Sequence, residues 1–69
     1  MKLEAILDKV SEGAILLNVE VGKNLTAEIR TMAEEADRID AIVAQFGEQE
    51  VTALRALYDG LEITTRAAS

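Results

Sequence analysis

Seven apolar residues follow one another in steps of four and three along the middle of the chain. They are Leu25, Ile29, Met32, Ala36, Ile39, Val43 and Phe46. This spacing places all seven on one side of an α-helix, as in the seam of a coiled coil. It predicts a helix over 24–46, about 35 Å long at a rise of about 1.5 Å per residue. A chain of 69 residues cannot cover such a stripe alone, so the seam is a candidate protein-interaction surface.

The segment before Gly22 has a similar pattern. Its apolar residues again step by four and three, which predicts a helix over 2–21: Leu3, Leu7, Val10, Ala14, Leu17 and Val21. Gly13 weakens this prediction, because glycine inside a helix costs about 1 kcal/mol relative to alanine. Residues 17–21 also alternate apolar and polar, so a strand within 14–21 stays open as an alternative.

A third helix is expected over 50–66. The apolar residues that define it are Val51, Leu54, Leu57, Tyr58 and Leu61. Asp59-Gly60 is a dipeptide typical of hairpin turns, but its flanks follow helical spacing better than a two-strand pattern. Turns are expected at 22–24 and 47–49, where glycines separate the three segments.

These elements predict a single all-α domain over 1–69, built as a helical hairpin or three-helix unit that dimerises into a helical bundle. A parallel coiled coil of the seam is disfavoured, since Glu35 would then face Asp40 of the second chain. The outer face of the central helix would carry Arg30, Glu34 and Arg38 as an ion ladder.

Composition supports an aliphatic helical core, with 49% hydrophobic residues, one Phe, one Tyr and no Pro. The chain has no Cys and no His, which removes thiolate ligands and the commonest general base. We therefore expect no cofactor and no metal.

The net charge is −6, and no stretch gathers enough Lys and Arg to hold a phosphate backbone, so direct nucleic-acid binding is not expected. The longest apolar run, 14–17, is too short for a signal peptide or a membrane span. These features predict a cytoplasmic protein that does not bind membranes.

Clustered carboxylates are the only candidate chemistry. They are Glu34, Glu35, Asp37 and Asp40, with Glu48 and Glu50 further along. Acid–base catalysis needs two carboxylates in a cleft, and a small helical bundle offers little room for one. We interpret them as surface acids, and expect neither catalytic residues nor a small-molecule substrate.

Residues 25–28, Leu-Thr-Ala-Glu, lead into the predicted long helix, and 46–57 read Phe-Gly-Glu-Gln-Glu-Val-Thr-Ala-Leu-Arg-Ala-Leu. Together these segments resemble the C-terminal dimerisation helices of MarR-type winged-helix regulators, over about 45 residues. The resemblance implies a dimerising helical arm. It does not extend to DNA binding, because no helix-turn-helix or basic wing precedes these segments.

The sequence thus favours a non-enzymatic interaction or oligomerisation protein, an adaptor, regulatory or structural subunit assembling through the Leu25–Phe46 seam. Its expected partner is a second copy, with a dimer favoured, or a helical protein. One alternative is a small acidic inhibitor that binds a basic surface of another protein. A further alternative is a regulator's dimerisation arm without its DNA-binding part.

Overall fold

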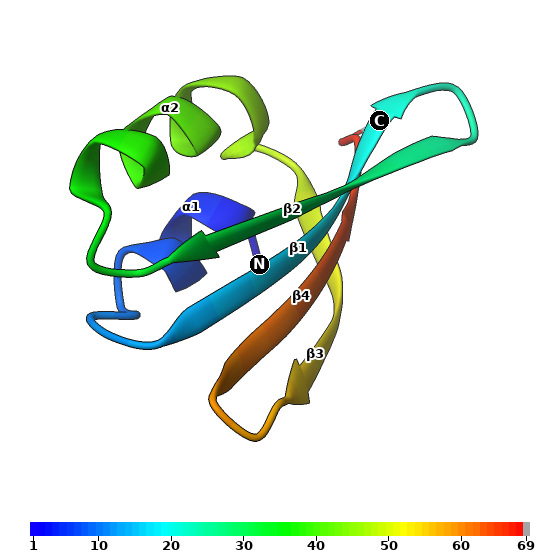
Figure 1. Ribbon diagram of the computed structural model, residues 1–69. Coiled ribbons are helices and arrows are strands. Elements are labelled where there is room, and N and C mark those ends of the chain that lie inside the picture. The colour runs from blue at the N-terminus through cyan, green and yellow to red at the C-terminus, as the bar shows by residue number, and fades with distance from the viewer. Residues whose placement is uncertain (69) are drawn as a thin grey trace.

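The computed structural model describes residues 1–68 and shows a mixed α/β fold with four strands and two short helices. In chain order the elements are α1 (Leu3–Leu7), β1 (Ala14–Gly22), β2 (Leu25–Met32), α2 (Ala36–Phe46), β3 (Glu50–Ala56) and β4 (Gly60–Arg66). The four strands form one twisted sheet, and both helices lie on the same face of it (Figure 1).

The sheet joins two antiparallel hairpins through a parallel central pair. The strand order is β2-β1-β4-β3, with β1 antiparallel to β2, β3 antiparallel to β4, and β1 parallel to β4. The parallel pair is possible because α2 lies between the hairpins in the chain and carries the backbone across. The outer strands β2 and β3 are therefore the two edges of the sheet.

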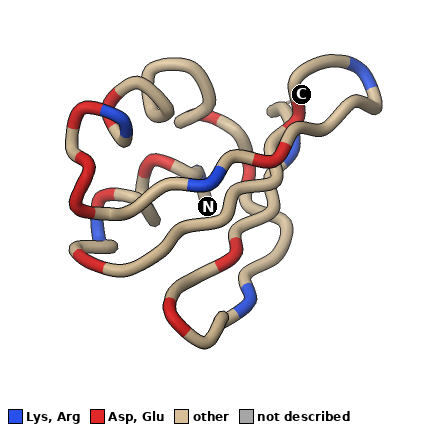
Figure 2. The backbone as a smooth tube through the Cα atoms, viewed as in Figure 1, with Lys and Arg blue, Asp and Glu red and all other residues tan. Residues whose placement is uncertain are grey.

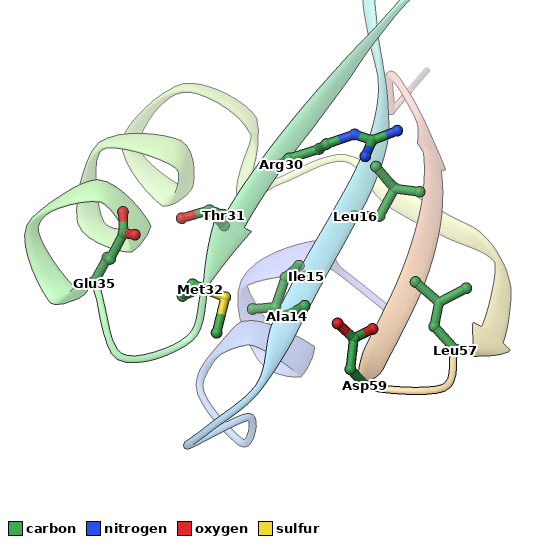
Figure 3. A pocket seen from close by; sticks show the side chains of 9 residues that line it. All are labelled: Ala14, Ile15, Leu16, Arg30, Thr31, Met32, Glu35, Leu57 and Asp59. Atoms are coloured by element: carbon green, nitrogen blue, oxygen red, sulfur yellow. The ribbon is translucent and has the colours of Figure 1, made fainter.

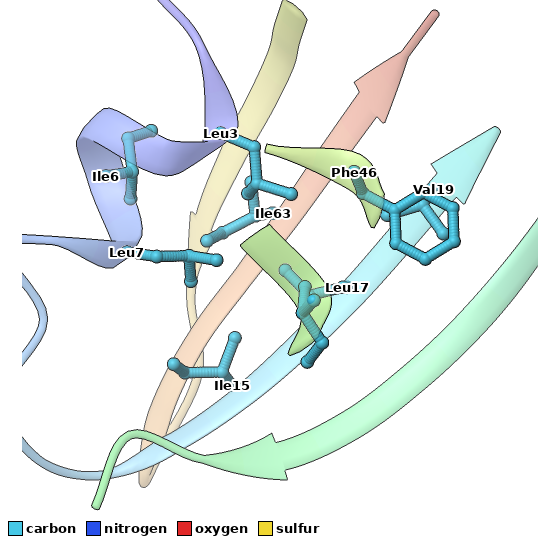
Figure 4. Close-up of a cluster of buried hydrophobic side chains, with 9 residues drawn as sticks. Leu3, Ile6, Leu7, Ile15, Leu17, Val19, Phe46 and Ile63 are labelled. Atoms are coloured by element: carbon cyan, nitrogen blue, oxygen red, sulfur yellow. The ribbon is translucent and has the colours of Figure 1, made fainter. Parts of the chain in front are cut away.

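Alternation along β1 divides the sheet into a covered face and an open face. Ile15, Leu17 and Val19 are buried beneath the helices, whereas the intervening side chains lie on the face that neither helix covers. Leu17 is paired with Ile29 on one side and Ile63 on the other. The helices complete this core with their own buried side chains, among them Leu3, Ile6, Leu7 and Phe46 (Figure 4). Ile42 of α2 is buried in the same core.

Backbone hydrogen bonds tie α1 to the connection between α2 and β3. Leu3 N–H donates to the Gln49 carbonyl at 2.9 Å, and Glu4 N–H donates to the Gly47 carbonyl at 3.0 Å. Gly47 is required at this contact, because a Cβ there would lie 3.2 Å from the Glu4 Cβ and closer still to the Val43 carbonyl. The N-terminus of α1 is thus anchored beside the end of α2.

The prediction of an all-α coiled-coil bundle is wrong, because most of the predicted helical length forms strands. Of the helix predicted over 2–21, only Leu3–Leu7 is helical; Gly13 adopts φ 100° and the chain then enters β1. The strand alternative within 14–21 is the one observed. Ile15 and Val19 favour this outcome, because β-branched side chains pack well on a pleated surface.

The helix predicted over 24–46 is divided between β2 and α2. The turn predicted at 22–24 is present, but it closes a hairpin, with Asn24 in the left-handed region at φ 60°. Leu25 and Ile29 are four residues apart, which is an even number and also close to one helical turn. They therefore share a face in a strand as well as in a helix. Pairing with β1 decides between the two, and only the last 11 residues, Ala36–Phe46, remain helical.

The helix predicted over 50–66 is wrong, because these residues form the β3–β4 hairpin. The hairpin turns at Asp59-Gly60, so the turn signal of this dipeptide was correct and the helical spacing of its flanks was misleading. Gly60 is required here, since a Cβ would clash with the Ala14 backbone of the neighbouring strand. The segments that resemble MarR-type dimerisation helices therefore lie largely in strands β2 and β3. Within residues 1–68, no helix is long and apolar enough to cross a membrane.

Candidate protein-interaction surface

The seven seam residues do not form one stripe in the folded chain. Leu25, Ile29 and Met32 belong to β2, whereas Ala36, Ile39, Val43 and Phe46 belong to α2. Leu25 is exposed near the hairpin turn, and Met32 lies on the open face. Ile39 and Val43 line a hollow between the two helices. Of the seam residues, Ile29 of β2 and Phe46 of α2 join the two halves of the seam at one surface feature.

That feature is a groove of about 310 Å³ between β2 and α2. Residues from both elements line this β2–α2 groove: Ile29, Arg38, Ala41, Ile42, Gln45 and Phe46. Ile29 is half-buried, and Ala41 is small enough to keep the groove open. The groove lies against β2, which is an outer strand of the sheet.

The backbone along the outer edge of β2 has hydrogen-bonding groups that no strand satisfies. Ala33 N–H donates to the Gly13 carbonyl, which fixes the phase of the ladder with β1. In an antiparallel pair alternate residues face the neighbouring strand, so Ala27, Ile29 and Thr31 bond to β1. The backbone amides and carbonyls that point outward belong to the residues between and beside them, Thr26, Glu28, Arg30 and Met32.

One of these outward groups has a side-chain partner. The Arg38 guanidinium donates to the outward carbonyl of Arg30 at 3.3 Å. Both side chains are exposed, so this bond competes with water and contributes little to stability. The Met32 carbonyl, at the end of this edge, accepts from Glu35 N–H at 3.0 Å. Arg38 partly covers the remaining edge, in the way that charged side chains protect the edge strands of many sheets.

Glu28 and Arg30 lie side by side on the open face of β2. Arg30 Nε and Glu28 Oε1 are 3.0 Å apart, with 79% and 51% of the two side chains exposed. Such an exposed pair adds little to the fold. The ladder predicted for Arg30, Glu34 and Arg38 is absent, because the three residues occupy a strand, a turn and a helix. Glu34 instead accepts a hydrogen bond from Gly13 N–H at 3.2 Å.

The opposite edge of the sheet, on β3, is partly covered by the chain's own N-terminus. Val51 N–H donates to the Met1 carbonyl at 2.8 Å, and Lys2 forms a bridge with Glu50. The Met1 amino group also contacts the Glu50 carboxylate at 3.1 Å. The part of this edge that stays open, 52–56, has one charged residue, Arg55, whose side chain pairs with Glu62 at 3.2 Å.

The open face contains a shallow hollow of about 360 Å³ at the end where β1 begins (Figure 3). Leu16, Met32 and Leu57 give it an apolar lining, and the Asp59 carboxylate lies at its rim. Among residues 1–68, no group of three or more acidic side chains is placed to hold a metal ion. The predicted carboxylate clusters are surface acids: Glu34, Glu35, Asp37, Asp40 and Glu48 are exposed, and Glu50 is half-buried at the β3 edge.

Acidic residues lie along both helices and the loop into α2 (Figure 2). Glu4, Asp8 and Asp40 line the hollow between α1 and α2 together with Ile39 and Val43, and no basic residue lines it. The helical layer therefore presents a negative surface, whereas the outer edge of β2 carries charges of both signs.

A scan against protein-family models, a search of curated proteins and a search of solved structures each found no significant match to this chain. Sequence reasoning placed the candidate interaction surface on the seven-residue seam, of which Ile29 and Phe46 line this groove. It did not identify the outward backbone of β2 or the contacts of Glu28, Arg30 and Arg38. The proximity of Glu28 and Arg30 could be predicted only if this segment was known to be a strand. Residues two apart share a face in a strand and not in a helix.

Proposed function

We propose that this protein is a small, non-enzymatic interaction module that binds an extended polypeptide along the outer edge of β2. The observation that supports this most is the row of outward backbone groups on β2 that no neighbouring strand pairs, beside an apolar groove. An added strand would satisfy the backbone groups, and its alternate side chains would enter the β2–α2 groove beside Ile29. The cytoplasmic location expected from the sequence is part of this proposal.

The chemistry of the surface supports binding in this mode. Backbone hydrogen bonds give affinity for any extended chain, while the groove and the charged residues Glu28 and Arg30 select among sequences. The expected interaction through the Leu25–Phe46 segment is retained in a changed form, because its contacts come from a strand and a helix side by side. A helical partner is not part of this proposal, since a helix cannot pair with a strand edge.

The test is a selection of displayed random peptides on the purified protein, followed by amide exchange measured by NMR on the complex. Bound peptides are expected to slow exchange at the outward amides of Thr26, Glu28 and Arg30. The inward amides of Ala27 and Ile29 already bond to β1 and should change little. Peptides that bind without protecting the β2 amides would contradict the proposal.

A matched pair of variants sharpens the test. Thr26→Pro removes an outward amide and should leave the ladder to β1 intact, because proline is tolerated on edge strands where the lost amide faces solvent. It should weaken peptide binding about tenfold. Thr26→Val keeps the amide and a β-branched side chain, and should bind like the unmodified chain.

The acidic helical layer supports a second candidate, an inhibitor that covers a basic surface of another protein. The hollow lined by Glu4, Asp8 and Asp40 is the observation in its favour. Binding of this kind falls steeply as salt is raised, whereas strand addition in an apolar groove survives high salt. A titration of any captured partner between low and high salt therefore separates the two functions.

A further inference from the structure

Two copies of the chain can pair antiparallel and symmetrically through the outer edge of β2 in only a few registers. The residues whose backbone points outward are Thr26, Glu28, Arg30 and Met32, and in a hydrogen-bonded pair each must face another residue of this kind. Two copies related by a two-fold axis present the same edge to each other, so the same residues pair on both sides. Allowed registers therefore differ by steps of two residues.

Charge selects one of these registers. When Ile29 lies on the two-fold axis, Glu28 faces Arg30 of the second copy, and Arg30 faces Glu28 of the second copy. One register step in either direction instead places Glu28 opposite its own counterpart, or Arg30 opposite its own counterpart. Opposite charges directly across a strand pair are favourable and like charges are unfavourable. Only the register centred on Ile29 places opposite charges across from each other at both Glu28 and Arg30.

We propose that the polypeptide bound at this edge is a second copy of the chain, paired antiparallel through β2 with Ile29 on the two-fold axis. This inference rests on the proposed function and specifies its partner. The dimer would have one continuous sheet across both copies. Glu28 and Arg30 would then form ion pairs between copies in place of the exposed pair within one copy, at 3.0 Å.

The covered face is compatible with the same register. Ile29 is half-buried beside α2 and would meet Ile29 of the second copy, extending the apolar layer across the axis. The groove-lining residues of α2, Arg38, Ala41 and Gln45, lie along the same side. Both α2 helices would then flank the axis on one face of the joined sheet.

The β3 edge does not offer an equivalent arrangement. Its open part, 52–56, contains a single charged residue, so no register of two copies can place opposite charges across it. Its first part is already paired with the N-terminal segment through Met1 and Lys2. Pairing through β2 therefore closes as a dimer and does not continue through β3 into longer assemblies.

Charge exchange between two variants tests this register. Glu28→Arg leaves arginine at both positions, and Arg30→Glu leaves glutamate at both, so each variant faces like charges across the axis twice. Each is expected to dimerise at least tenfold more weakly than the unmodified chain in sedimentation equilibrium. An equal mixture of the two should form a heterodimer of nearly original affinity, seen as the mixed mass in native mass spectrometry. The double variant E28R/R30E should recover the homodimer.

Controls separate local pairing from net charge. Glu48→Arg and Lys9→Glu make the same changes in net charge at exposed positions away from β2, and should dimerise within about twofold of the unmodified chain. Glu28→Arg also makes the chain less negative, so an effect of overall repulsion would strengthen its dimer. Weakening by this substitution therefore reports the register.

Several results would overturn the inference. They are a chain that stays monomeric at millimolar concentration, single variants that dimerise normally, or a mixture that forms no heterodimer. If the chain is monomeric while selected peptides still protect the Glu28 and Arg30 amides, this inference fails and the proposed function stands. If the chain is monomeric and no selected peptide protects these amides, both this inference and the proposed function fail.

Discussion

The guanidinium of Arg38 on α2 donates a hydrogen bond to the backbone carbonyl of Arg30 on β2, at 3.3 Å. That carbonyl points away from the sheet, where an added strand would need it as an acceptor. Arg38 therefore competes with any strand that binds to β2, and its bond must break before the edge is fully paired. The Arg38 side chain on α2 thus affects how readily the outer edge of β2 can pair with another strand.

Arg38→Ala is expected to dimerise about three- to fivefold more tightly, because neither copy then has to break this weak, solvent-exposed hydrogen bond before pairing. The dissociation constant can be measured by sedimentation equilibrium. Arg66→Ala is the matched control, since it removes the same charge at an exposed position at the end of β4. A weaker dimer for Arg38→Ala would show that Arg38 supports the interface and does not guard it.

Thr31→Val should raise the free energy of unfolding by about 1 kcal/mol. Thr31 is buried on the covered face, and its hydroxyl has no hydrogen-bond partner, so the polar group is desolvated without compensation. Thr65 is the matched control: it is also buried, but its hydroxyl donates to Gln49 Oε1 at 2.7 Å. Thr65→Val should therefore be destabilising by a similar amount. Urea unfolding of both variants at one low protein concentration measures the contrast, and equal signs would contradict it.

Gln49→Glu should lower the free energy of unfolding by about 1–3 kcal/mol at pH 7. The Gln49 amide group holds the backbone of Glu20 from both ends: Nε2 donates to the Glu20 carbonyl, and Oε1 accepts from Glu20 N–H at 3.1 Å. A carboxylate keeps the acceptor but places an unpaired oxygen against that carbonyl.

The deficit of Gln49→Glu should shrink on acidification. A protonated carboxyl can donate to the Glu20 carbonyl, so folding raises the pKa of the introduced group. Its contribution to stability is then present at low pH and is lost as the pH rises through the folded-state pKa. Unfolding followed from pH 7 down to pH 4, relative to the unmodified chain, checks the sign. A constant difference over that range would contradict the geometry around Gln49.

The sequence predicted the breaks in this fold better than the elements between them. The turns at 22–24 and 47–49 are where expected, and the second half of the seam, from Ala36 to Phe46, is a helix. The other segments were ambiguous because their apolar residues fit both the helical spacing of three to four and the strand spacing of two. Leu17, for example, belongs to the helical series with Ala14 and Val21 and to the strand series with Ile15 and Val19. The density of β-branched residues was the local signal that favoured strands.

Pairing between distant strands could not be predicted from local pattern. The parallel contact of β1 with β4 joins Leu17 to Ile63, and nothing in either segment alone specifies it. The same limit applies to the candidate site. Glu28 and Arg30 become a self-complementary pair only once β2 is known to be an edge strand with their backbone groups facing outward.

Amide exchange of the unmodified chain at low and high concentration tests the central claim most directly. We predict that the amides of Glu28 and Arg30 exchange rapidly in dilute solution and slow markedly, together, as the concentration rises and the mass doubles. The amides of Leu54 and Ala56, on the β3 edge, should stay fast throughout. Slowing confined to β3, or a doubled mass without protection of β2, would contradict the claim that the outer edge of β2 is the interaction surface.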